Sequence, residues 1–320
     1  MKYYLGIDLG GTNIVTGVVT EKYEIITKYT EKVGIDHSLE SVTNQIIHAI
    51  DMVLEQADMT LEQLESVGMG SPSCMDPKTG LHVHLNCFDW HNVPLHKMLQ
   101  ERLLKPLLIR NDADCAAYGE VLAGAASHLQ SAVMITLGTG VGGGVILDKH
   151  IFNGCDGMGA ELGHTKLVFE GEMCTCGQQG CFEAYASATA LINQTRQAAK
   201  AVPDSLLNTL CAGDLSQIEG RTAFDAAKQG DETAIAVIEQ YIAYLAAGLS
   251  SLVTIFRPEA IIIGGGISRQ EQILLKPLNE KLRQCTFAAN EVGVPPVIKA
   301  KLGNDAGLIG AAMLDVDGEQ

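Results

Sequence analysis

The sequence predicts an α/β protein built from two domains. Its 320 residues exceed the usual size of a single domain. Buried strand patterns alternate with segments of helical period, which is typical of α/β architecture. A strand, a glycine-rich turn with threonine and a second strand occur twice, in residues 3–19 and 131–148, and this internal echo indicates two related halves that hold a nucleotide from both sides. Because the sequence has no long linker, we expect the domains to meet across a cleft.

Composition and charge exclude several classes of function. Hydrophobic residues make up 47% of the chain and charged residues 19%, so the sequence supports a large core and excludes disorder. The formal net charge of −16 argues against a nucleic-acid partner, because phosphate backbones are bound by clustered Lys and Arg. Small anionic ligands would instead be held by backbone N–H groups and metal, and the 34 glycines indicate loops suited to such contacts.

The cysteines and the N-terminal residues bear on location. Apart from a group in residues 174–181, the cysteines are scattered without the spacing of a disulfide framework, so we expect reduced thiols. A strand pattern begins within the first residues with no signal peptide ahead of it, and no apolar run reaches the ~18 or more residues of a membrane span. We therefore expect a cytoplasmic protein without a membrane partner.

The chain opens with a predicted phosphate-binding hairpin, in which a buried strand over residues 3–9 returns as a second strand over residues 14–19. Glycines in the turn allow the backbone to approach a phosphate without a Cβ clash, and the polar residues after them add donors. The turn residues are Gly10, Gly11, Thr12 and Asn13. Asp8 is placed to hold Mg²⁺ through water. A plain β-hairpin is the alternative.

The segment between the two hairpins supplies helices that cover a sheet and strands that end in polar residues. Apolar residues at helical period predict a helix over residues 38–56, followed by a short strand from residue 67 and a second helix that ends near residue 104. A further strand from residue 106 leads to Asp112 and then to a helix over residues 115–125.

Asp112 is the predicted general base. Ligands of open α/β sheets bind beyond the carboxyl ends of the strands, and a carboxylate at such a strand end, before a helix N-terminus, is well placed to accept a proton. Helix capping is the alternative role for acidic residues here, and we assign capping to Asp114.

The second hairpin, over residues 131–148, carries Thr139 and Gly140 in its turn. Its glycines resemble a dinucleotide-binding fingerprint, but residues 145–147 read as a strand where such a unit needs a helix. We therefore predict a second phosphate-binding turn, with Thr139 and Gly140 as nucleotide contacts.

Residues 159–183 combine three cysteines and a histidine in a glycine-rich loop flanked by two glutamates. The side chains of His164, Cys174, Cys176 and Cys181 match the closed tetrahedral Cys₃His shell of structural zinc. Such a shell has no place for an activated water, so the chemistry would come from residues that the loop positions, first of all Glu161 and Glu183. Reduced core thiols are the alternative.

The remaining chain is mostly helical. Helices are predicted over three segments, residues 184–201, 222–228 and 232–253. A strand then leads into a triple-glycine turn with Gly265 and Gly266, where a flat ring or a ribose can lie on the backbone. A helix from residue 303 closes the chain.

These motifs, in this order, resemble the ROK group of bacterial sugar kinases and repressors, and within it the chain looks most like the glucokinases. The matching segments are Asp8-Leu9-Gly10-Gly11-Thr12, residues 137–144, Glu161-Leu162-Gly163-His164, the C-x-C-G-x-x-G-C-x-E element of residues 174–183, residues 263–266 and residues 302–307. The cysteine element is the specific one, whereas each glycine turn alone is a weak signal.

The resemblance implies an actin-like (ribonuclease H-like) fold of two α/β domains with a nucleotide and sugar cleft between them. The N-terminal domain would span residues 1–115 and be completed by the C-terminal helix 304–320, and the C-terminal domain would span residues 116–303 and carry the zinc-bound loop 164–181. The implied reaction is transfer of the ATP γ-phosphoryl group to the 6-hydroxyl of a hexose, first of all glucose.

The resemblance also implies roles for individual residues. Asp112 would accept the hydroxyl proton, and His164 would bind zinc through one ring nitrogen and sugar through the other. The implied sugar-binding residues are Asn86, Asn111, Asp112, Glu161, His164 and Glu183. The implied ATP-binding residues are Gly10, Gly11, Thr12, Asn13, Thr139, Gly140, Gly265 and Gly266, with Mg²⁺ linked to Asp8. A homodimer or homotetramer is expected.

Two departures from the family pattern leave the sugar open. The chain has Pro72-Ser73 where Pro-Gly is usual, and Cys87-Phe88-Asp89 where a Leu-Pro-Gly-type segment is usual. N-acetylmannosamine, fructose and allose are alternatives to glucose, and a sugar-binding regulatory protein without catalysis is an alternative to a kinase. A repressor is disfavoured, because a repressor carries a helix-turn-helix before the first hairpin.

Overall fold

The computed structural model describes residues 1–76, 78–85 and 87–314. Contacts divide the chain into two compact units. The first unit contains residues 1–132, 144–160 and the chain from residue 301 onward, and the second contains residues 133–143 and 161–300. The chain therefore passes between the units four times. The division into domains at residues 115 and 303, expected from the sequence, stays a prediction.

A five-stranded sheet in the order β3-β2-β1-β4-β8 forms the centre of the first unit. Its strands are β1 (Tyr3–Leu9), β2 (Asn13–Thr20), β3 (Ile25–Lys32), β4 (Val67–Ser71) and β8 (Leu107–Asn111). The first three strands form an antiparallel meander, whereas β1, β4 and β8 run parallel to one another. The carboxyl ends of β1, β4 and β8 therefore meet at one edge of the sheet.

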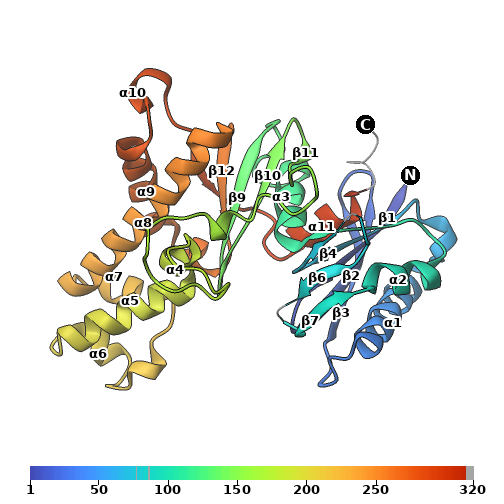
Figure 1. Cartoon of the computed structure of the whole chain (residues 1–320), viewed down its shortest axis with the longest axis horizontal. Coiled ribbons are helices and arrows are strands. Elements are labelled where there is room, and N and C mark those ends of the chain that lie inside the picture. The colour runs from blue at the N-terminus through green and yellow to red at the C-terminus, as the bar shows by residue number, and fades with distance from the viewer. Residues whose placement is uncertain (77, 86, 315–320) are drawn as a thin grey trace. The chain divides into compact units, whose positions relative to one another are not determined.

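Helices cover this sheet (Figure 1). They are α1 (Leu39–Ala57), α2 (Leu95–Leu103), α3 (Asp112–Leu122) and α11 (Asp305–Ala312). Helix α1 begins as predicted at the N-cap Ser38, whose side chain accepts a hydrogen bond from the Ser41 N–H, and it packs on β2 and β3. Helix α11 lies against β1, β4 and α3. A Cβ at Gly68 or Gly310 would clash with the backbone of Ala311 or Cys115, so the absence of side chains permits this close approach.

A small antiparallel sheet adjoins the main one in the first unit. Its strands are β5 (Cys74–Met75), β6 (His82–Leu85) and β7 (Trp90–Val93), in that order. Trp90 is buried, and its indole N–H donates to the His37 carbonyl over 2.7 Å. This contact attaches β7 to the segment that precedes α1.

The second five-stranded sheet has the order β11-β10-β9-β12-β13. Its strands are β9 (Ala132–Leu137), β10 (Val141–Leu147), β11 (His150–Ile151), β12 (Ala260–Gly264) and β13 (Val297–Lys299). The segment after the second glycine turn is thus a strand, as predicted. β12 is completely buried and pairs in parallel with β13.

The second unit is otherwise helical. Its helices are α4 (Glu183–Ala186), α5 (Ala188–Ala201), α6 (Leu206–Leu210), α7 (Thr222–Lys228), α8 (Glu232–Phe256), α9 (Glu271–Cys285) and α10 (Ala289–Val292). Short 3₁₀ turns lie in the second unit at Leu162–His164, Leu215–Gln217 and Gly266–Gln270, and in the first unit at Leu61–Gln63. Helix α8 packs against α5, α7 and α9.

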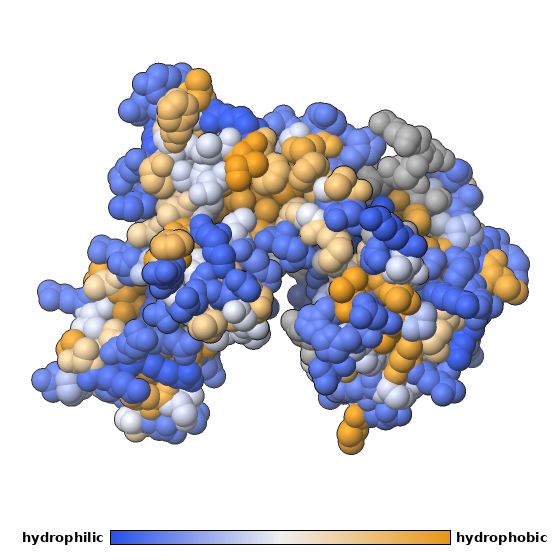
Figure 2. Space-filling model, viewed as in Figure 1, coloured by the Kyte–Doolittle hydropathy of each residue, from blue (hydrophilic) through white to orange (hydrophobic). Residues whose placement is uncertain are grey.

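Helix α8 corrects one expectation. Among the described residues it is the one helix long and apolar enough to span a membrane by length and composition, so the statement that no such run exists was wrong. Half of its apolar window is buried among other helices, as in a core helix. On the face shown in Figure 2, the neighbouring helices α5 and α6 present mostly hydrophilic residues.

Candidate functional site

The carboxyl edge of the first sheet brings three predicted site residues into one region. Asp8 is the penultimate residue of β1, Asn111 ends β8 and Asp112 begins α3. The parallel register of β1 with β4 and of β4 with β8 places them there, since Asp8 pairs with Gly70 and Asn111 pairs with Ser71. β4 packs against the start of α3, since a Cβ at Gly70 would be in van der Waals contact with the Asp112 Cα at 3.5 Å.

Asp8 and Asp112 interact electrostatically. Burial, and secondly the negative charge of Asp112, raise the pKa of Asp8 to about 6. Asp112 lies at the N-terminus of α3, where its Oδ1 is 2.8 Å from the Ala113 N–H, and the helix dipole favours a negative charge at that position. The pair therefore offers two carboxylates at one edge of the sheet, suited to a cation and to a proton acceptor.

The structure corrects the start of this helix. Asp112 is the first residue of α3, and Asn111 is its N-cap, with the side-chain oxygen 2.8 Å from the Ala113 N–H. Asp114 is not the N-cap predicted from the sequence but lies buried in the first turn. The local sequence Asn-Asp-Ala-Asp offers several capping residues, and the strand pairing of Asn111 selects among them.

The first glycine turn has the predicted form. The Gly10 N–H donates to the Asn13 carbonyl over 2.9 Å, and the Thr12 carbonyl accepts from Val33 over 2.9 Å. A Cβ at Gly11 would lie 2.8 Å from the Cys87 Cβ, so Cys87, one of the departures from the family pattern, packs directly on this turn.

Ser73, in the other departure from the family pattern, also has a side-chain partner. The Ser73 hydroxyl lies 2.7 Å from Nδ1 of His82, and burial lowers the pKa of His82 to about 4, so its ring is neutral at physiological pH. A cavity of about 50 Å³ beside them is lined by Ser73, Met75, Ile109, Arg110, Asn111, Asn153, Asp156 and Gly157. Of the predicted sugar-binding residues, Asn111 lines this cavity and Asn86 lies outside the described residues.

In the second unit, the turn with Thr139 and Gly140 is held from two sides. The N-terminus of α5 contacts it, since the Thr189 hydroxyl donates to the Thr139 carbonyl and the Ala188 N–H to the Gly138 carbonyl, both over 2.8 Å. Glu183 accepts a hydrogen bond from the Val141 N–H over 2.8 Å, and a Cβ at Gly140 would clash with its carboxylate. The other oxygen of Glu183 accepts from the Thr175 hydroxyl over 2.8 Å, so this residue joins the turn to the cysteine loop.

Gly265 and Gly266 follow β12 beside the same turn. Gly265 has φ 79°, and a Cβ there would clash with the Leu137 backbone, so only glycine combines this conformation with this close approach. A cavity of about 330 Å³ adjoins both turns. Its lining residues are Leu137, Gly138, Thr139, Ala188, Glu219, Gly220, Arg221, Gly266, Ile267 and Gln270. Glycine backbone and aliphatic side chains make much of this wall, which suits a flat heteroaromatic ring.

The proposed zinc ligands converge. One ligand atom from each of His164, Cys174, Cys176 and Cys181 lies within 4.8 Å of all the others. The Cys176 and Cys181 sulfurs are 3.7 Å apart, and the Cys174 sulfur is 3.7 Å from Nδ1 of His164. In a tetrahedron with Zn–S bonds near 2.3 Å the sulfur atoms are about 3.8 Å apart. The donor set and its spacing therefore fit zinc, and Nε2 of His164 is left for another contact.

Glu161 and His164 bound one short turn. Glu161 is exposed and precedes the 3₁₀ turn Leu162–His164, whose Gly163 packs so closely on the Val141 backbone that a Cβ would clash. The second unit therefore groups Glu161, His164 and Glu183 around the cysteine loop, as predicted from their spacing.

Sequence reasoning missed several residues that lie in or support these regions. Glu120 is completely buried and accepts hydrogen bonds from the N–H groups of Ala125, Lys301 and Leu302 over 2.7–2.8 Å. Its partners lie up to 182 residues away, so no local signal identifies it. Arg110 lies next to the predicted residue Asn111, so the sequence offered a signal for it. Asn153, Asp156 and Gln270 also line the cavities but belong to no recognisable motif.

Comparison with known proteins agrees with this organisation. The ROK family model matches residues 4–317. A glucokinase from Thermotoga maritima is 40% identical over 311 residues, which cover 97% of this chain and 96% of that protein. The crystal structure of a ROK family glucokinase from Streptomyces griseus in complex with glucose and AMPPNP has a TM-score of 0.80 and 34% identity, with 98% of both chains covered. The α/β prediction and the actin-like fold are thereby confirmed.

The chain is also similar to a transcriptional repressor, at lower identity. A xylose repressor from Caldicellulosiruptor bescii is 29% identical over 293 residues, which cover 89% of this chain and 71% of that protein. Kinases and repressors thus share this fold, as the sequence resemblance implied. With a family match over nearly the whole chain, the protein belongs to the ROK family.

Proposed function

We propose that this protein transfers the γ-phosphoryl group of ATP to the 6-hydroxyl of a hexose, with glucose as the first candidate. The observation that carries the proposal is the pair Asp8 and Asp112 beside a glycine turn, in a chain that matches glucokinases over nearly its full length. Phosphoryl transfer requires positioning and neutralisation of charge more than covalent chemistry by the protein. An acidic pair and two glycine turns meet that requirement.

Asp112 is the proposed general base. Its position at the start of α3 lets the helix dipole and the Ala113 N–H stabilise the ionised form that accepts the hydroxyl proton. Asp8 would hold Mg²⁺, which neutralises phosphate charge when bound. Asn111, whose side chain caps the same helix, would contact the sugar together with Asp112, and Asn86 remains a predicted sugar contact.

The cysteine loop is the proposed sugar-recognition element of the second unit. His164, Cys174, Cys176 and Cys181 would hold a structural zinc ion, which fixes the ring of His164 and leaves Nε2 for a sugar hydroxyl. Glu161 and Glu183 are the proposed carboxylate contacts to other hydroxyls. Both oxygens of Glu183 already accept hydrogen bonds, so it can accept sugar hydroxyls only through its remaining lone pairs.

ATP is proposed to bind both glycine turns. Gly10, Gly11, Thr12 and Asn13 would approach the phosphates, and Thr139 and Gly140 would do so from the second unit. The cavity that includes Thr139, Gly266 and Ile267 is the proposed site of the adenosine moiety, next to Gly265. We further propose a cytoplasmic location, because ATP is an intracellular metabolite, and a homodimer or homotetramer, as the family resemblance implies.

A second candidate function is non-catalytic sugar binding, favoured by the likeness to a xylose repressor. One assay separates the two: ATP consumption measured with a panel of hexoses and N-acetylhexosamines. We expect turnover with glucose to exceed turnover with N-acetylmannosamine, fructose and allose. Sugar binding without turnover of any of them would exclude the kinase and support the second candidate.

A further inference from the structure

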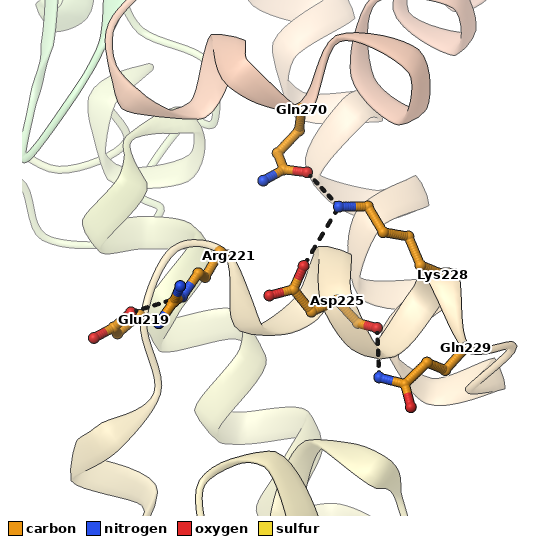
Figure 3. Close-up of polar contacts among 6 residues, drawn as sticks. All are labelled: Glu219, Arg221, Asp225, Lys228, Gln229 and Gln270. Atoms are coloured by element: carbon orange, nitrogen blue, oxygen red, sulfur yellow. Dashed lines mark hydrogen bonds and ion pairs between the residues drawn. The ribbon is translucent and has the colours of Figure 1, made fainter.

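A lysine and a glutamine meet at the edge of the proposed adenosine cavity. Lys228 is the last residue of α7, and Gln270 is the last residue of the 3₁₀ turn that follows the triple glycine. The Lys228 amine donates to Oε1 of Gln270 over 2.9 Å and lies 3.4 Å from Oδ1 of Asp225 (Figure 3). The two residues are 42 positions apart in the chain, and Gln270 also lines the cavity.

This contact determines the orientation of the Gln270 carboxamide. A lysine ammonium group has only donors, so the atom of Gln270 that faces Lys228 must be the oxygen. The amide nitrogen is then directed to the opposite side, away from Lys228, as Figure 3 shows. Asp225 holds the amine from its other side, so the ammonium group has two acceptors that fix its position.

The Gln270 amide is one of the side-chain donors that line the cavity, together with the guanidinium group of Arg221. The Nε of Arg221 is used, because it donates to Glu219 over 3.0 Å. Leu137, Ala188 and Ile267 supply aliphatic wall, and glycines supply backbone. Because Gln270 lines the cavity and its oxygen is taken up by Lys228, a ligand gains affinity on this side by presenting an acceptor to the amide N–H groups.

We propose that Gln270 donates a hydrogen bond to the adenosine moiety of ATP and that Lys228 is the positioning residue that turns its amide toward the nucleotide. The inference rests on the proposed function for the identity of the nucleotide. Both Lys228 and Asp225 are nearly half exposed, at 47% and 42%, so their ion pair adds little stability and its effect is on geometry.

The test measures the affinity of three probes: ATP through its KM, adenosine by calorimetry, and tripolyphosphate as a competitor of ATP. Gln270→Ala should raise the KM for ATP and the Kd for adenosine by roughly 3- to 10-fold, the range of one neutral hydrogen bond. Gln270→Glu keeps an oxygen for Lys228 but has no N–H, so it should show the same loss. Affinity for tripolyphosphate, which has no base or ribose, should stay unchanged, as should the KM for sugar.

Lys228→Met tests the positioning role. It should raise the Kd for adenosine by a smaller factor in the wild-type background and have no further effect in Gln270→Ala, because the amide it orients is gone. Lys276→Met, which removes an exposed lysine of α9, is the matched control and should change neither value.

Two results would overturn the inference: unchanged adenosine affinity in both Gln270 variants, or an equal effect of Lys228→Met in both backgrounds. Calorimetry with adenosine needs no turnover, so it decides the role of Gln270 even if no sugar is phosphorylated. Absence of turnover with intact adenosine binding would count against the proposed function alone.

Discussion

The acidic edge of the first unit and the cysteine loop of the second are held in place by different forces. Asp8 and Asn111 lie on strands whose ladder hydrogen bonds fix their position through backbone register. Between His164 and Cys181 the described backbone has no strand ladder. It is joined by two isolated bridges, Lys166 with Cys181 and Met173 with Gln179, and by turn hydrogen bonds. Side-chain contacts among the cysteines and Glu183 replace the ladder. A substitution on the edge should therefore change chemistry, whereas one in the loop should change local order.

The largest expected effect is that of Asp112→Asn. The amide keeps the shape and the position at the start of α3 but cannot accept the hydroxyl proton. We expect kcat to fall by roughly 10²-fold or more, with sugar binding retained. Steady-state kinetics and calorimetry with glucose measure the two quantities. Near-normal kcat would remove the catalytic role from Asp112, and Asp51→Asn, on an exposed position of α1, serves as control.

The next prediction concerns Glu120, whose side chain joins α3 to the backbone before α11. Glu120→Gln replaces one carboxylate oxygen by an NH₂ group that faces a backbone donor, so either the Ala125 N–H, just after α3, or the N–H groups of Lys301 and Leu302, before α11, lose their acceptor. We expect a loss of about 2 kcal/mol in the free energy of unfolding. Denaturant titration measures it, and Glu65→Gln, at an exposed position, is the control. A change below the error of that titration would contradict the anchoring role.

Loss of one loop cysteine should act locally. Cys176→Ser should abolish stoichiometric zinc, found by elemental analysis, and raise the KM for sugar by roughly 10-fold through loss of His164 orientation. Amide hydrogen exchange should increase in residues 165–181 and stay unchanged in β1 and β4. Cys155→Ser removes an exposed thiol outside the loop and should change none of these. Active wild-type protein without zinc would show that the cysteines serve another purpose.

The remaining prediction concerns the pH dependence of stability. The folded-state pKa of Asp8, about 6, is higher than the usual 3.8, so folding favours its neutral form. The stability from this neutral form is fully present below about pH 4 and is lost as pH rises through about 6. Asp8→Asn, which stays neutral, should therefore be more stable than wild type at pH 8 by up to about 3 kcal/mol, with no difference below about pH 4. Thermal unfolding in EDTA from pH 4 to 8 measures this, and lower stability of the variant at pH 8 would contradict it.

Much of the fold was predictable because its signals are local. The first hairpin, the N-cap of α1 at Ser38, the strand after the second glycine turn and helix α7 all agree with the sequence pattern. β3 and α9 were not predicted. β3 lies at the edge of its sheet and has no residue that is fully buried, and α9 contains Pro277, which interrupts the pattern of a helix.

The candidate site likewise contains features that the sequence predicts and features that it does not. The spacing of His164, Cys174, Cys176 and Cys181 is a property of 18 consecutive residues, and the convergence of their side chains follows from it. The roles of Asp8 and Asp112 were each predicted from a strand end, but their approach was not predicted and follows from the parallel register of β1, β4 and β8. The choice of Asn111 over Asp114 as N-cap was not, since it depends on where the β4 and β8 ladder ends.

The sequence by itself thus determined the reaction class that we propose, through short motifs whose geometry the backbone sets within a few residues. Only the tertiary structure decided which distant groups support them: Glu120 of α3 against the segment before α11, Glu183 between the Thr139 turn and the cysteine loop, and Lys228 against Gln270. Such contacts join residues 42 to 181 positions apart, and side-chain hydrogen bonding has no sequence period, so packing alone selects the partner.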